Sequence, residues 1–368
     1  MPRAFEAATD ARWLARSGAN PDCGAGTIPI DYDRLLAGTD FDPRMGQSPA
    51  AFAAGRSFEK ACAGVSNSYA PLLTALAEKG LDTGNGGIEI FPDSLSDQER
   101  AQRTRRRLRL ICSGDRSVVL ILQAVLGFDF AGHVTYIRPD AVALVPVADR
   151  LFVAEMKSFR LRDGHYPAGK IATALEQTAV YQVALRRILI ELHLDPALIS
   201  DEGVIVCARN LGMEPVATRH DNGHRVATLE QRIARAEARL RAAPDPRPLM
   251  AGTDSGTSAA DRLAAFVAIV DTYGVAYKPS CLVNCGAAFW CRADAADDPA
   301  RLGNTRLLAP AASLRLADAW SHGTAPAGPA QAQVAAHLAG VRRLVDAARA
   351  DSGLPVPRPA RLRRAAAP

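Results

Sequence analysis

Two acidic residues and one lysine are the side chains in this sequence best suited to chemistry. Asp140 lies on one predicted β-strand, and Glu155 and Lys157 lie on the next strand along the chain. Glu155 and Lys157 share a face, because side chains two positions apart on a strand point the same way. A short hairpin brings Asp140 to that face as well. The pattern therefore predicts two carboxylates and one ammonium group around a common point.

This grouping suits the cleavage of a phosphodiester bond. Carboxylates bind Mg²⁺ or Mn²⁺, and such a metal polarises a phosphoryl oxygen and lowers the pKa of a bound water. Lys157 would orient that water and offset charge that develops in the transition state. The alternative is an exposed strand edge with solvated charges, and the apolar flanking segment Val142–Val147 disfavours it.

The same residues resemble a known nuclease signature. Pro139-Asp140, fourteen residues, and then Glu155-Met156-Lys157 resemble the PD-(D/E)xK motif. Gly55 to Glu59 resembles the upstream G-x-x-x-(H/E) motif, and Gln177 to Tyr181 resembles the Q-x-x-x-Y motif of RecB-type nucleases. The three matches stand in the family's order, and with the cysteines described below the resemblance covers most of residues 20–292.

The resemblance assigns roles to further residues. It implies that Glu59 joins Asp140 and Glu155 as a third carboxylate at the metal. It also implies that Gln177 and Tyr181, which share one side of a helix, contact the DNA backbone or stack on a terminal base. The plain alternative is that both side chains only cover the sheet.

A dense cysteine group stands near the C-terminal end, as Cys281-x3-Cys285-x5-Cys291. It resembles the cysteines of the iron–sulfur RecB-type nucleases, including CRISPR-associated exonucleases and the AddB subunit. That resemblance implies a [4Fe–4S] cluster closed by Cys23, which joins the two ends of the domain. The first gap departs from the family, with three residues where two are usual.

Other interpretations of the cysteines remain open. Cys62 is a rival fourth ligand, Zn²⁺ could replace the cluster, and the trio could hold no metal. Cys112 and Cys207 are predicted to be inert core cysteines, because apolar residues surround them.

The predicted fold is α/β: a restriction-endonuclease-like mixed β-sheet flanked by helices, with the iron–sulfur (or zinc) cap joining N- and C-terminal segments. We expect an N-terminal layer (1–50), a nuclease core (51–219), a helical segment with the cysteine cap (220–292), a helical extension (293–350) and a disordered basic tail (351–368). Three consecutive antiparallel strands are predicted at Val118–Asp129, His133–Val145 and Arg150–Phe159. Long helices are predicted at Ser96–Arg109, Ala168–Leu192 and Ala259–Tyr273.

Composition is compatible with nucleic acid and does not establish it. The formal net charge is +5, and only five of the 44 basic residues are lysine. The strongest run holds Arg105 and Arg106, which we expect to contact DNA phosphates; a solvated helix face is the alternative. With neither a secretory signal nor a membrane span in the sequence, we expect a cytoplasmic protein.

The expected activity is metal-dependent DNA hydrolysis, exonucleolytic on single strands, in repair, recombination or defence. A non-cleaving DNA-binding subunit is the rival. No phosphate-binding loop of a helicase is found in the sequence, and a helicase or another DNA-processing protein is a possible partner.

Overall fold

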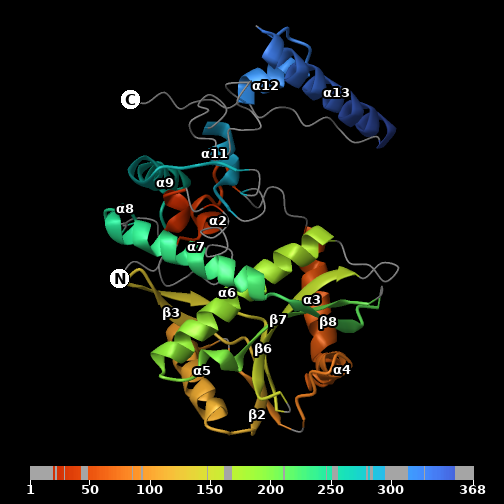
Figure 1. Ribbon diagram of the computed structural model, residues 1–368, viewed down its shortest axis with the longest axis vertical. Coiled ribbons are helices and arrows are strands. Elements are labelled where there is room, and N and C mark those ends of the chain that lie inside the picture. Colours follow the sequence, from red (N-terminus) through yellow and green to blue (C-terminus); the bar gives the residue numbers. More distant parts are fainter. Residues whose placement is uncertain are drawn as a thin grey trace.

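The computed structural model contains a six-stranded mixed sheet with helices on both faces (Figure 1). It describes residues 20, 23–28, 30–42, 49–84, 86–92, 94–146, 148–160, 168–209, 212–245, 247–250, 256–278, 281, 285–294, 314–326 and 328–352. The predicted α/β class and mixed sheet are confirmed. Residues 1–19 and the tail from 353 onward lie outside the described residues.

The sheet has the strand order β1-β2-β5-β6-β7-β8. Pairing is parallel between β1 and β2 and between β6 and β7, and antiparallel at the other junctions. The strands are β1 (Gly87–Ile90), β2 (Val118–Leu122), β5 (Ala141–Val145), β6 (Arg150–Arg160), β7 (Ile199–Ala208) and β8 (Pro215–Asp221).

Two of the three predicted long strands are each broken in two. β2 is followed by β3 (Leu126–Phe130), and β4 (His133–Ile137) is followed by β5; β3 and β4 pair only with each other, in a separate antiparallel hairpin. The first break falls at Gln123, whose φ is +53°, a left-handed conformation that ends an extended strand. The second falls at Pro139, which has no N–H to donate to a sheet. Only Arg150–Phe159 is confirmed as one strand.

Helices cover the two faces of the sheet in different ways. The face formed by Val142, Leu144 and Val153 packs under α6 (Ala168–Glu191). The opposite face, which includes Ala143 and Phe152, packs under α3 (Pro49–Ala63) and α4 (Ala70–Ala77).

Further helices flank this core or lie beyond it. α5 (Asp97–Cys112) packs against β3 and β4, and α7 (Gly223–Ala242) packs against α6. The remaining described elements are η1 (Ala25–Thr27), α2 (Tyr32–Leu35), η3 (Pro196–Leu198), α8 (Arg247–Met250), α9 (Ala259–Tyr273), α11 (Ala288–Asp294), α12 (Leu314–Ser321) and α13 (Pro329–Ser352). α12 and α13 form a hairpin with its own small core around Trp320. None of the described helices is long and apolar enough to span a membrane.

The N-terminal segment packs against the helices α9 and α11 (Figure 1). Tyr32 lies edge-to-face on Phe266 of α9 at 5.5 Å, and Phe266 lies edge-to-face on Trp290 of α11 at 5.1 Å. Ala25 N–H donates to the carbonyl of Gly274 at 2.9 Å. Aromatic packing and backbone hydrogen bonds therefore join these segments.

Candidate active site at the β5–β6 hairpin

The hairpin register brings Asp140 and Glu155 together. Ala141 is paired with Ala154, so Asp140, one residue before β5, lies across from Glu155. The Met156 N–H donates to Asp140 Oδ2 at 2.7 Å and fixes the carboxyl against β6. Lys157 Nζ pairs with Glu155 Oε1. The structure thus brings together the three side chains that the sequence predicts to share a site.

Burial makes negative charge costly at this site. Glu155 is 3% exposed and Asp140 is partly buried. Burial raises the pKa of Asp140, and so does the charge of Glu59, whereas Lys157, the Met156 N–H and a hydrogen bond with Glu155 act in the opposite direction. Because the folded-state pKa is raised, the stability contributed by this carboxyl is lost as the pH rises from its ordinary value through the folded one. A bound cation would offset that cost.

Glu59 lies on α3, on the other side of the two strands, and its side chain is exposed. It is within electrostatic reach of Asp140 and of Cys62, whose pKa is raised to about 12 by burial first and then by Asp140 and Glu59. Among the residues that the structure describes, no three His, Cys, Asp or Glu side chains converge closely enough to hold one metal ion. The predicted three-carboxylate set is thus not assembled, and the pair Asp140 and Glu155 remains.

Tyr181 is in the core rather than at a surface. It is 3% exposed and belongs to the apolar cluster between α6 and the sheet, while Gln177, one turn earlier, is partly buried. Base stacking by Tyr181 does not fit this burial, because stacking needs an accessible ring face. The spacing placed both residues on one side of the helix, and that side packs inward.

One ion pair beside the site was not anticipated. Arg138, two residues before Asp140, donates through Nε to Asp97 Oδ1 at 3.2 Å, and its Nη2 contacts the same oxygen. Asp97 is the first residue of α5. The start of α5 is therefore anchored to the segment that carries Asp140. An Arg next to Pro139-Asp140 and an Asp in the first turn of an Arg-rich helix were the available signals.

The arginines of α5 divide into two groups. Arg105 donates to the Gly127 carbonyl at 3.0 Å and pairs with Glu191. These contacts occupy the guanidinium that was predicted to contact DNA phosphates. Arg107 pairs with Glu89 at 2.5 Å and with Asp115 at 3.3 Å. Arg106 is exposed, as a phosphate contact requires.

The four predicted cluster cysteines lie in one region, where the N-terminal segment meets α11. Burial raises the pKa of the Cys291 thiol, and the charges of Cys285, Cys23 and Cys281 raise it further. Gly26 N–H donates to Cys23 Sγ at 3.2 Å, and Asn20 Nδ2 donates to Cys281 Sγ at 3.5 Å. The sulfurs do not converge on a common point among the described residues.

The other three cysteines, Cys62, Cys112 and Cys207, lie elsewhere. Cys62 is fully buried with α3, α4 and the opposite face of the sheet, away from the other thiols. Cys207 is fully buried on β7, and burial raises its pKa to about 11. Cys112 is only half-buried, so the prediction of a core cysteine holds for Cys207 and not for Cys112.

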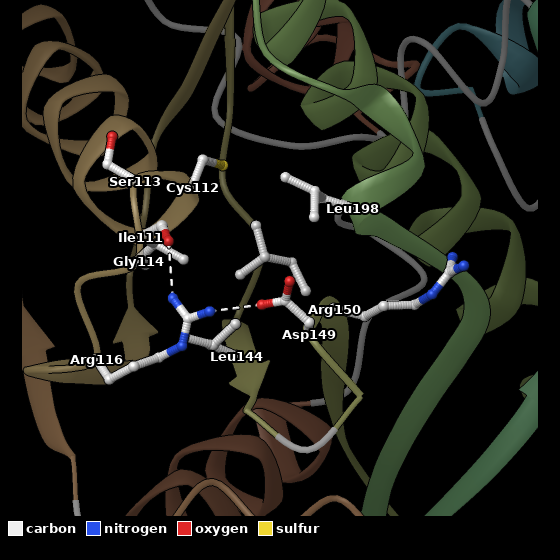
Figure 2. Close-up of a pocket in the computed structure, with 10 residues that line it drawn as sticks. Ile111, Cys112, Ser113, Gly114, Arg116, Leu144, Asp149, Arg150 and Leu198 are labelled. Atoms are coloured by element: carbon white, nitrogen blue, oxygen red, sulfur yellow. Dashed lines mark hydrogen bonds and ion pairs between the residues drawn. The ribbon is translucent and has the colours of Figure 1, made fainter.

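Cys112 lines a cavity of about 300 Å³ at the opposite end of the β5–β6 hairpin (Figure 2). Arg116 crosses it, donating to the Ile111 carbonyl at 2.9 Å and pairing with Asp149 at 2.5 Å. Leu144 and Leu151 form its apolar wall. The cavity contains neither Asp140 nor Glu155 and is separate from the candidate active site.

The junction of the N-terminal and C-terminal segments is closely packed at Gly24. Gly24 has φ −61° and ψ −49°, which any residue can adopt, but an added Cβ would lie 1.9 Å from the Tyr273 carbonyl oxygen. Gly24→Ala should therefore destabilise the protein by about 1–3 kcal/mol, the usual cost of overpacking. Thermal unfolding measures this, with Gly55→Ala as the control.

Gly55 is inside α3, and an added Cβ there meets nothing within 4 Å. Gly55→Ala should leave stability unchanged or raise it by up to about 1 kcal/mol, because alanine favours helix. Equal melting temperatures for Gly24→Ala and the wild type would show that the junction is looser than described.

Comparisons of the chain with models of known protein families, with curated proteins and with solved structures found no match.

Proposed function

We propose that this protein is a metal-dependent DNA nuclease of the PD-(D/E)xK type with a restriction-endonuclease-like core. The observation that carries the proposal is that Asp140 and Glu155 lie side by side across one hairpin and that Lys157 forms an ion pair with Glu155. A buried carboxylate and a partly buried one on the same strand pair are costly for folding on their own, and a function explains their presence. The order of the sequence motifs supports the same conclusion.

The donor set fits Mg²⁺ or Mn²⁺. Mg²⁺ keeps several waters and is commonly held by one or two carboxylates together with substrate phosphates, so Asp140 and Glu155 suffice without Glu59. When bound, the cation would polarise a phosphoryl oxygen and lower the pKa of a water. Lys157, whose side chain is 31% exposed, can reach both Glu155 and a phosphate in the site.

The cysteines support a second proposal, an iron–sulfur cap. Cys23, Cys281 and Cys285 all lie within electrostatic reach of Cys291, although Cys23 comes from the other end of the described chain. Four thiols suit a [4Fe–4S] cluster or, alternatively, Zn²⁺. The separation of Cys62 from this group favours Cys23 as the fourth ligand.

End-labelled single- and double-stranded DNA should be cut in Mg²⁺ or Mn²⁺ and left intact in EDTA. Gel analysis of the products gives the strand preference. The melting temperature of the wild type should also rise with Mn²⁺, because the cation binds the folded state and offsets the charge of the buried carboxylates. The absence of both cutting and a melting shift, in protein that binds DNA, would point to a non-cleaving DNA-binding subunit instead.

A further inference from the structure

α5 runs from the candidate active site to the far end of the hairpin. Its first residue, Asp97, pairs with Arg138 near Asp140. The capping box of Ser96 and Glu99 fixes that start, with Glu99 N–H donating to Ser96 Oγ at 3.2 Å. The last residue, Cys112, lies with Leu144 and Leu151 around the distant cavity (Figure 2). The helix thus forms a surface that leads away from the carboxylates, which we call the α5 track.

Protein contacts select which arginines of α5 are available along that track. Arg105 and Arg107 are held by Glu191, Gly127, Glu89 and Asp115, as described above. The arginines at every third position, Arg103, Arg106 and Arg109, are exposed. In the described part of the chain none of these three forms an ion pair. The nearby carboxylate of Glu99 is already bonded to Ser96.

We propose that Arg103, Arg106 and Arg109 bind the phosphates of a DNA strand that extends from the candidate active site. This inference rests on the proposed nuclease function. Three-residue steps along a helix rise about 4.5 Å, and Asp97 to Arg109 spans about 18 Å. A single strand of B-form DNA carries one phosphate per 3.4 Å of axis, so the distance from Asp97 to Arg109 matches roughly five nucleotides and the three arginines themselves, about 9 Å from first to last, match roughly three. A single row of charges fits one backbone, which favours single-stranded DNA.

The chain supplies a charge-matched control on another helix. Among the exposed arginines of α7 are Arg225, Arg232 and Arg235, and this helix packs on α6 and η1 rather than beside Asp140. Replacement of either set by glutamine removes the same charge. Only the α5 set lies on a helix anchored, through Asp97 and Arg138, to the segment that carries Asp140.

The test measures binding without cleavage. Fluorescence anisotropy of labelled single-stranded DNA, titrated with full-length protein in EDTA at several salt concentrations, gives the salt dependence of affinity. The triple variant Arg103→Gln/Arg106→Gln/Arg109→Gln should bind at least about tenfold more weakly at low salt. Its slope of log affinity against log salt should be shallower by about 2, because each phosphate contact on a single strand contributes about 0.7. The variant Arg225→Gln/Arg232→Gln/Arg235→Gln should keep the wild-type slope.

The outcomes separate this inference from the nuclease proposal. A wild-type slope for the α5 variant, or an equal loss for the α7 variant, would overturn the α5 track whether or not the protein cuts DNA. A reduced slope in a protein that never cuts would support the track while refuting the nuclease. A larger loss with duplex than with single-stranded DNA would overturn the assignment to one strand. Unchanged melting temperatures show that the exposed substitutions leave the fold intact.

Discussion

DNA cleavage should fall by at least about a hundredfold in Lys157→Ala, the size of loss that follows removal of one group that stabilises transition-state charge. The ammonium of Lys157 forms an ion pair with Glu155 at the site. It is therefore available to offset charge that develops on a phosphate there. Single-turnover cleavage in Mg²⁺ measures the effect, and DNA affinity should be largely retained because arginine contacts to phosphates dominate binding.

The lysine substitution carries a cost for stability that must be separated from chemistry. It leaves Glu155, which is 3% exposed, without its ion pair, and breaking a buried pair is destabilising. Asp140→Asn provides the second test. It removes a carboxyl whose pKa is raised by burial, so it should stabilise the metal-free fold at neutral pH while abolishing cleavage.

An exposed lysine supplies the matched control for charge. Lys170, in the first turn of α6, is exposed, and Lys170→Ala should cut at the wild-type rate. If Lys157→Ala cleaved DNA at the wild-type rate, or if Lys170→Ala lost as much activity, Lys157 would have no specific role in the reaction. Undiminished cleavage by Asp140→Asn would remove the whole hairpin site.

The candidate site was accessible from the sequence because it is local. Alternation on one strand fixes that Glu155 and Lys157 share a face, and a short hairpin limits where Asp140 can lie. By contrast, the strand break at Gln123 depends on one residue with positive φ inside an apolar run, which periodicity does not detect. The short strand β1, which pairs in parallel with β2, was not predicted at all.

For some residues the sequence-based predictions failed because tertiary contacts determine their burial and their partners. The i, i+4 spacing of Gln177 and Tyr181 fixes that they share a side of α6, but only packing against the sheet shows that this side is buried. The arginines of α5 are alike in sequence, and distant partners such as Glu191 determine which of them are available. Partners far away in the chain leave no local pattern.

Loss of iron on substitution of the cap cysteines is the second large effect that we expect. Cys23→Ser, Cys281→Ser, Cys285→Ser and Cys291→Ser should each yield protein with little iron and without the brown colour of a cluster. A cluster that joins Cys23 to Cys291 would close a loop through most of the described chain, so its loss should affect folding as a whole. The melting temperature should fall by about 3 °C or more, as expected for a loss of about 2 kcal/mol in a chain of this size.

Two other cysteines serve as controls for this experiment on anaerobically purified protein. Cys112→Ser changes a half-buried thiol at the cavity and should keep its iron. Cys62→Ser decides the fourth ligand, because Cys62 lies on the Glu59 side of the sheet while Cys23 lies beside the trio. If Cys62→Ser lost its iron and Cys23→Ser kept it, Cys62 would be the fourth ligand. Stoichiometric zinc in the wild type would show that the cap holds a zinc site instead of a cluster. Wild-type protein without either metal would show that protein contacts, such as the packing around Phe266, hold the cap together.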